Sequence, residues 1–230
     1  MVGDALSHSS LAGVALGLLL GINPVLGAGA LCIVAAFGIE AIRKKIPRYS
    51  EMAIAIIMSA GIGLAGVLSG FVEDSANFNS FLFGSIVSIS RGEMLAVCII
   101  SVAVLLVLGI FSRELFYIGF DENAARISGV PVRQVNFIFT ILTALTVSAA
   151  SRTVGTLIVS SMLVVPVACG MQMAKSYRMT LVCGVIVAVV TTITGLFLSY
   201  YVGVKPGGTI VLLEVLWFLV VVIAKRVFIR

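Results

Sequence analysis

The residues with the clearest capacity for chemistry are an acidic and an imidazole side chain near the start of the chain, Asp4 and His8. His8 is the only histidine in the sequence, and it follows Asp4 by four residues. On a helix, side chains four residues apart lie on one face, so a carboxylate and an imidazole at this spacing can bind one divalent cation together. A helix-capping Asp beside an interfacial His has the same spacing, so the pair alone is a weak motif.

A second candidate, Glu214, lies within the last apolar stretch of the sequence. An ionisable residue inside a membrane span is costly, and for that reason it is a candidate for function. Glu214 either faces the interior of a helix bundle, where it would pair with a basic or hydroxyl group and could belong to the pathway of a metal ion, or lies near the end of its span and reaches water. Both interpretations remain open at the level of sequence.

Membrane-spanning helices must position these side chains. Of the 230 residues, 60% are hydrophobic and 11% are charged, and the mean hydropathy is +1.21. This composition excludes a soluble globular domain and a disordered chain. At about 20 apolar residues per span, the length allows about eight spans. The apolar stretches are residues 5–22, 25–42, 52–72, 94–112, 135–150, 154–174, 181–201 and 209–224.

The expected fold class follows from the lipid that surrounds such a chain. In hydrocarbon, each backbone N–H must bond within its own segment, and the sequence lacks the alternating pattern of barrel strands. We therefore predict an all-α, polytopic helical membrane protein in which residues 1–230 form a single transmembrane domain. The sequence contains no GxxxxGK[ST] phosphate-binding loop, so ATP hydrolysis would reside on a separate chain.

The charges predict an orientation. The net charge of +5 comes from 15 Lys and Arg against 10 Asp and Glu, and the basic residues lie at the ends of the apolar stretches. This pattern indicates orientation in membrane lipid rather than binding to nucleic acid. Residues 43–48, 113–133, 175–178 and 225–230 are predicted to be cytoplasmic, whereas Arg152 falls on the outer side as an exception.

Four phrases of the sequence are distinctive: GDALSHSSLAGVALGLLLG, FLFGSIVSIS, FDENAARISGVPV and VGTLIVSSMLVVPVACGMQMAKSYRM, the last of them followed by GLFLSYYVGVKPGGTIVLL. Together they resemble the membrane subunits of bacterial zinc and manganese ABC importers. They occur in the family's order and span nearly the whole chain, a combination that is specific although no single phrase is. Family members usually carry one further helix before the first phrase, so the resemblance implies that this chain lacks that first helix.

The resemblance implies the permease subunit of an ATP-driven importer in the bacterial cytoplasmic membrane, and hence a transporter subunit rather than an enzyme. It implies a homodimer, a separate ATP-binding cassette subunit on the inner face and an extracytoplasmic metal-binding protein on the outer face. Asp4 and His8 match the family's acidic–His pair, so they would hold transported Zn²⁺, Mn²⁺ or iron rather than a permanently bound cofactor. The single histidine favours zinc.

Two other classes remain open. The last third of the chain is distantly similar to permeases for cobalamin and iron-siderophores, which would carry a bulky chelate without using Asp4 and His8 as direct ligands. A membrane-embedded enzyme would need a second catalytic constellation, and the sequence offers one His and few carboxylates within its apolar stretches.

An importer must also pass motion from its ATPase to the membrane helices, usually through a short cytoplasmic helix. We favour the segment after Pro166, a residue that can kink its helix. The expected contact residues are Ala174, Lys175, Ser176, Tyr177 and Arg178. The second choice is the segment Asp121–Gly129, in which Asp121 is a predicted helix N-cap and the contacts would be Asp121, Glu122 and Arg126.

Overall fold

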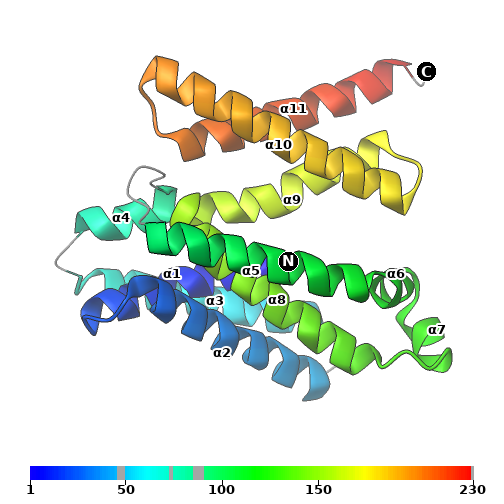
Figure 1. The fold of residues 1–230 in the computed structure, drawn as a ribbon, viewed down its shortest axis with the longest axis horizontal. Helices are drawn as coiled ribbons and strands as arrows, with labels where there is room; N and C mark the ends of the chain where they lie inside the picture. Colours follow the sequence, from blue (N-terminus) through cyan, green and yellow to red (C-terminus); the bar gives the residue numbers. More distant parts are fainter. Residues whose placement is uncertain (46–49, 73–74, 85–90, 229–230) are drawn as a thin grey trace.

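The computed structural model describes residues 1–45, 50–72, 75–84 and 91–228, and within them it contains helices and no strands (Figure 1). The helices, in chain order, are α1 (Val2–Leu19), α2 (Pro24–Lys45), α3 (Ser50–Ser69), α4 (Ser75–Phe83), α5 (Arg91–Ile110), α6 (Ser112–Phe120), α7 (Glu122–Ile127), α8 (Val132–Thr153), α9 (Thr156–Met173), α10 (Tyr177–Val202) and α11 (Pro206–Phe228).

The prediction of a polytopic all-α protein is confirmed. Among the described residues, seven helices are long and apolar enough to cross a membrane: α1, α2, α3, α5, α8, α10 and α11. A shorter apolar segment, Ile158–Met173 in α9, corresponds to the remaining apolar stretch of the sequence. Every apolar stretch therefore corresponds to one apolar helix.

Helix α1 lies at the centre of the bundle, where it packs against α2, α3, α8 and α9. Small residues permit this close packing. A Cβ atom on Gly13 would lie only 2.4 Å from the carbonyl oxygen of Gly27 in α2, and a Cβ on Gly61 in α3 would lie 3.0 Å from the backbone nitrogen of Ser9. The middle of α1 is consequently held closely by α2 on one side and by α3 on another.

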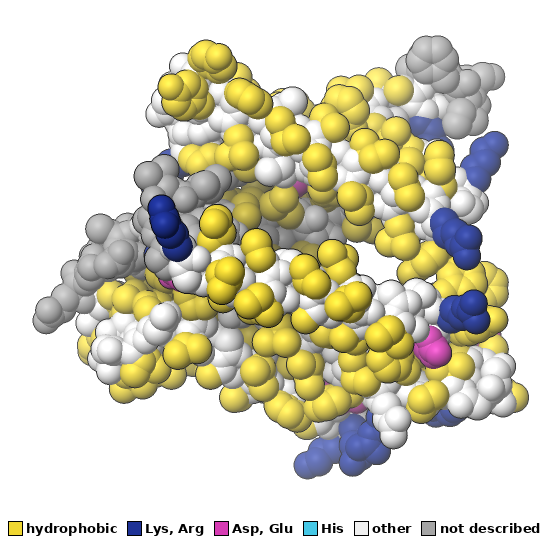
Figure 2. All heavy atoms as spheres, viewed as in Figure 1, with side chains coloured by type: hydrophobic (Ala, Val, Ile, Leu, Met, Phe, Trp, Pro, Cys, Tyr) yellow, Lys and Arg dark blue, Asp and Glu magenta, His cyan; other side chains and the backbone are white. Residues whose placement is uncertain are grey.

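The hairpin of α10 and α11 packs mainly against α9, on the side of the molecule away from α2 (Figure 1). Apolar side chains cover much of the surface of α5, α10 and α11 (Figure 2). Exposed apolar area of this extent is typical of helices that face lipid. Helix α9 is therefore the element that joins this hairpin to the core around α1.

The short helix α4 is locked to the start of α9 by two glycines. Gly84 and Gly155 both have positive φ, +75° and +97°. A Cβ on Gly155 would lie 2.4 Å from the backbone nitrogen of Gly84, so the two backbones touch at a point where no side chain fits. Residues 85–90 of the FLFGSIVSIS phrase lie outside the described residues.

The segments predicted to be cytoplasmic lie toward one end of the molecule. Helices α6 and α7, the α9–α10 turn and the end of α2 all lie toward the right of Figure 1. Helix α7 begins as predicted, because Oδ1 of Asp121 accepts hydrogen bonds from the backbone nitrogens of Asn123 (2.9 Å) and Ala124 (3.1 Å). Residues 46–49, which follow α2, are outside the described residues.

Candidate metal-ion site

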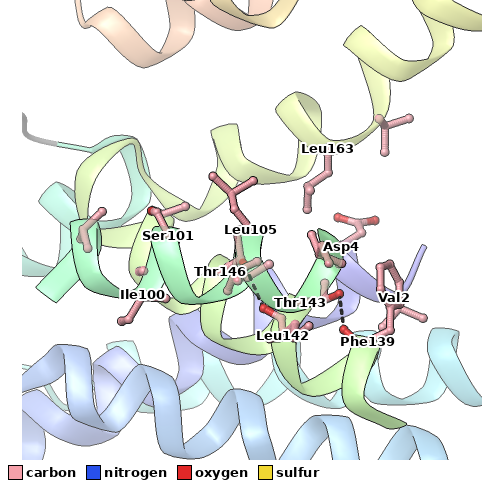
Figure 3. Close-up of a pocket in the computed structure, with 18 of the residues that line it drawn as sticks. Val2, Asp4, Ile100, Ser101, Leu105, Phe139, Leu142, Thr143, Thr146 and Leu163 are labelled. Atoms are coloured by element: carbon pink, nitrogen blue, oxygen red, sulfur yellow. Dashed lines mark hydrogen bonds between the residues drawn. The ribbon is translucent and has the colours of Figure 1, made fainter. Parts of the chain in front are cut away.

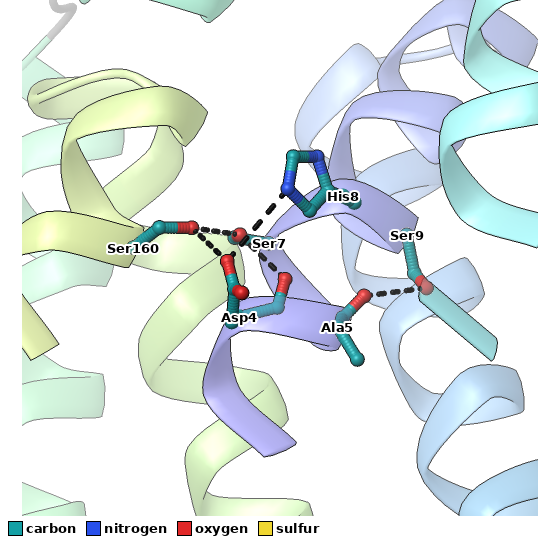
Figure 4. Close-up of polar contacts among 6 residues, drawn as sticks. All are labelled: Asp4, Ala5, Ser7, His8, Ser9 and Ser160. Atoms are coloured by element: carbon teal, nitrogen blue, oxygen red, sulfur yellow. Dashed lines mark hydrogen bonds and ion pairs between the residues drawn. The ribbon is translucent and has the colours of Figure 1, made fainter. Parts of the chain in front are cut away.

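Asp4 and His8 lie on one face of α1, as their spacing predicts (Figure 4). Oδ1 of Asp4 is 3.7 Å from Nε2 of His8. Both side chains are partly exposed, Asp4 by 34% and His8 by 22%. The carboxylate and the imidazole are thus close enough to share one cation and open enough to receive it.

Two serines complete the polar cluster. Oγ of Ser160, from α9, donates a 2.6 Å hydrogen bond to Oδ1 of Asp4. Oγ of Ser7 donates to the backbone carbonyl of Asp4 at 2.7 Å and lies 2.7 Å from Oγ of Ser160 (Figure 4). The cluster therefore joins α1 to α9 and offers hydroxyl oxygens beside the carboxylate and the imidazole.

The cluster lies at the middle depth of the neighbouring helices. A Cβ on Gly3 would lie 2.6 Å from Leu163 Cδ1 and 3.7 Å from Thr143 Cγ2, and these two residues are near the midpoints of α9 and α8. Substrate and ion sites of membrane transporters commonly lie near the bilayer midplane. The first turn of α1 therefore lies beside the middle of α8 and of α9.

Asp4 also lines a cavity of about 840 Å³ between α1, α5, α8 and α9 (Figure 3). Most of the lining is apolar, and the lining hydroxyls of Thr143 and Thr146 donate to carbonyls of their own helix at 2.8 Å. Asp4 thus supplies the charged side chain among the described residues that line this largely apolar space.

The described residues contain no group of three or more His, Cys, Asp and Glu side chains that could hold a metal ion. Asp4 and His8 are therefore the strong ligands of this cluster, and the hydroxyls of Ser7 and Ser160 are weaker oxygen donors. A structural zinc site usually has four strong ligands in a closed shell. The arrangement here is open and suits an ion that is bound in passing.

The structure places Glu214 apart from this cluster. Glu214 lies on α11, which packs against α9 and α10, and it does not line the cavity beside Asp4. Its side chain is fully buried near the hydroxyl of Ser161 in α9, although within the described part of the chain neither carboxylate oxygen is within hydrogen-bond geometry of a partner. Glu214 therefore lies inside the bundle rather than at a water-exposed end of its helix.

The α9–α10 turn, our first candidate for coupling, packs beside α6, the helix that directly precedes the second candidate segment. Phe116 of α6 packs edge-on against Tyr177, at the start of α10, with ring centroids 5.1 Å apart. Arg113 and Arg178 line the same groove of about 600 Å³. The N-cap Ser176 accepts a hydrogen bond from Met179, and Glu122 and Arg126 form an exposed ion pair at 3.3 Å.

The sequence interpretation missed Ser160. Its only signal was a pair of adjacent serines, Ser160 and Ser161, inside an apolar stretch. Which of the two faces α1 depends on the packing of α9, and the spacing of residues along the chain does not determine that.

Comparisons with known proteins identify the family of this chain. The model of the ABC 3 transport family matches residues 1–225. A probable metal transport system membrane protein of Treponema pallidum is 33% identical over 231 residues, which cover 99% of this chain and 85% of the relative. The manganese import system permease protein ScaB of Streptococcus gordonii is 32% identical over 220 residues, covering 96% and 79%.

A solved structure has the same fold. It is described as PsaBC from Streptococcus pneumoniae in complex with Fab, and it matches with a TM-score of 0.81 and 31% identity over 95% of this chain and 79% of that chain. The family resemblance inferred from the sequence and the expected location in the bacterial cytoplasmic membrane are both confirmed. The chain is a multi-pass membrane protein that belongs to the ABC 3 transport family.

Proposed function

We propose that this chain is the permease subunit of an ATP-driven importer of divalent metal ions, and that Asp4 and His8 bind the ion in the translocation pathway. The observation that carries the proposal is the polar cluster at middle depth, in which Asp4 and His8 of α1 lie 3.7 Å apart and Ser160 of α9 bonds the carboxylate. The relatives described as metal and manganese transport proteins support the same class of cargo.

Among metals, we place manganese ahead of the zinc that the single histidine suggests. The cluster offers one imidazole nitrogen against a carboxylate and two hydroxyls, those of Ser7 and Ser160. Oxygen donors suit Mn²⁺, whereas zinc sites are richer in nitrogen and sulfur. The name of the Streptococcus gordonii relative supports the same order.

The remaining ligands of the bound metal ion would come from water or from a second copy of the chain. In a homodimer with two-fold symmetry, two equivalent clusters contribute to one assembly. A separate ATP-binding cassette subunit would supply the energy at the cytoplasmic end, and an extracytoplasmic metal-binding protein would deliver the ion at the opposite end.

We also propose that the ATPase docks on a surface formed by α6, α7 and the α9–α10 turn. Phe120 at the end of α6 and Ile127 at the end of α7 are each 88% exposed, at the end of the molecule predicted to be cytoplasmic. Apolar side chains this exposed outside the lipid region are typical of a protein interface. Because α7 follows α6 after one residue and Phe116 of α6 contacts Tyr177, motion of α7 would reach α10 through α6.

Metal uptake tests the proposed function. Cells that lack their own manganese importer would express this chain with its ATPase and binding protein, and uptake of Mn²⁺ and Zn²⁺ would be measured. We expect Asp4→Ala and His8→Ala to abolish uptake while the protein still inserts into the membrane, with Ser9→Ala as the matched control on α1. Normal uptake by both variants would refute the assignment, and uptake of a cobalamin or siderophore instead would support the alternative class.

A further inference from the structure

A small polar pocket of about 290 Å³ lies at the end predicted to be cytoplasmic, among α2, α7 and α8. Four of its lining side chains are cationic and come from all three helices, and two are carboxylates. The cations are Arg43, Lys44, Arg126 and Arg133, and the carboxylates are Glu40 and Glu122. The pocket therefore carries an excess of two positive charges.

One cation of the pocket, on α7, is already paired with a carboxylate, so the excess of positive charge lies on α2 and α8. Glu122 pairs with Arg126 at 3.3 Å. No ion pair involves Arg43, Lys44 or Arg133 in the part of the chain that the structure describes. Like charges held close together repel one another, and an anion between them relieves that repulsion. Figure 2 shows basic side chains gathered near the end of α2.

An apolar surface continues from the pocket toward the membrane interior. Phe37 precedes Lys44 by seven residues and Phe137 follows Arg133 by four, so each aromatic ring shares a helix face with a pocket cation. The two rings contact each other between α2 and α8, with centroids 5.4 Å apart. Seven helical residues span about 10 Å, so the rings lie in the region of the acyl chains when the cations lie among headgroups.

The outer face of this aromatic pair is open. Phe37 is 51% exposed, and Val34, which lies one turn earlier in α2 and farther from the pocket, is 62% exposed. The site thus combines a cationic pocket for a headgroup with an exposed apolar strip for hydrocarbon. Soluble phosphate compounds match the pocket alone, whereas a phospholipid matches both parts.

We propose that this pocket binds the phosphate group of an anionic phospholipid of the inner leaflet, with an acyl chain along Val34 and Phe37. Basic pockets between membrane helices on the cytoplasmic side are suited to anionic headgroups. Arginine forms bidentate hydrogen bonds with phosphate, and Arg43 and Arg133 can approach it from two helices. The site is separate from the Asp4 cluster, and its occupancy is measurable without metal or ATPase.

Lipid binding to the purified full chain tests the proposal. Native mass spectrometry in detergent would measure retained phosphatidylglycerol, phosphatidylcholine and glycerol 3-phosphate. We expect preferential binding of phosphatidylglycerol to the wild type. The double variant Arg43→Gln with Lys44→Gln should bind it about 30-fold more weakly at low salt, and Arg133→Gln about 5-fold more weakly.

The matched control is Lys45→Gln with Arg226→Gln, which removes one Lys and one Arg from exposed positions outside the pocket. It should bind phosphatidylglycerol like the wild type. Thermal melts identify any variant that fails to fold, and Arg133→Gln on α8 repeats the test independently of α2. Equal binding of phosphatidylcholine, displacement of the lipid by an equal concentration of glycerol 3-phosphate, or the same loss in the control would each overturn the proposal.

Discussion

Ser160 and Asp4, which are 156 residues apart in sequence, are joined by a 2.6 Å hydrogen bond from the serine hydroxyl to Oδ1 of the carboxylate. The same oxygen is the one that lies 3.7 Å from Nε2 of His8. One carboxylate oxygen is therefore shared between a partner on its own helix and a partner on α9. Any shift of α9 relative to α1 changes the environment of this oxygen.

Ser160→Ala should weaken metal binding without unfolding the protein. Loss of a group that orients a ligating carboxylate typically lowers metal affinity by about 10- to 100-fold. Binding of Mn²⁺ to the detergent-purified protein, measured by isothermal titration calorimetry, checks this. The control is Ser9→Ala, which removes a hydroxyl that donates to the carbonyl of Ala5 in its own helix. Equal affinities for both variants would show that Ser160 does not act on the site.

Gly155→Ala should destabilise the protein by about 2–4 kcal/mol. The φ of +97° disfavours a side chain, and the new Cβ would lie 2.4 Å from the backbone nitrogen of Gly84. The control is Gly208→Ala, since a Cβ there meets nothing within 4 Å. Thermal melts in detergent measure the difference, and equal melting temperatures would contradict the close contact between α4 and α9.

Glu214→Met should leave the folded state as stable as the wild type or more stable, by up to about 3 kcal/mol. The fully buried carboxyl has no hydrogen-bond partner among the described residues, and an apolar side chain of similar length avoids the cost of burying it. A melting curve gives the stability, and uptake of Mn²⁺ by the same variant gives the function. Normal uptake would exclude Glu214 from the ion pathway, and a lower melting temperature would show that the carboxyl is bonded in the membrane.

Local periodicity explains which parts of this molecule were predictable from sequence. The shared face of Asp4 and His8, the N-cap at Asp121 and the extents of the apolar helices depend on residues within a few turns of one another. The bond from Ser160 to Asp4 and the burial of Glu214 depend on how α9 packs between α1 and α11. Contacts between helices far apart in sequence leave no periodic signal in either helix.

The coupling surface gives the last prediction. If the ATPase docks on α6, α7 and the α9–α10 turn together, two separate double variants should each release it during purification. Phe120→Ser with Ile127→Ser removes exposed apolar area beside α7, and Tyr177→Ala with Arg178→Ala removes residue types that dominate interface energetics.

Each double variant should lower the affinity of the ATPase by at least about 30-fold, the loss expected when an interface anchor is removed. Co-purification and metal-stimulated ATP hydrolysis are the measurements. Arg226→Gln, an exposed cation at the end of α11, is the control and should retain the ATPase. Glu122→Gln with Arg126→Gln removes only an exposed ion pair and should have a small effect. If only the Tyr177 and Arg178 double variant releases the ATPase, docking is restricted to the α9–α10 turn. If both double variants retain the ATPase, the coupling surface lies elsewhere on the chain.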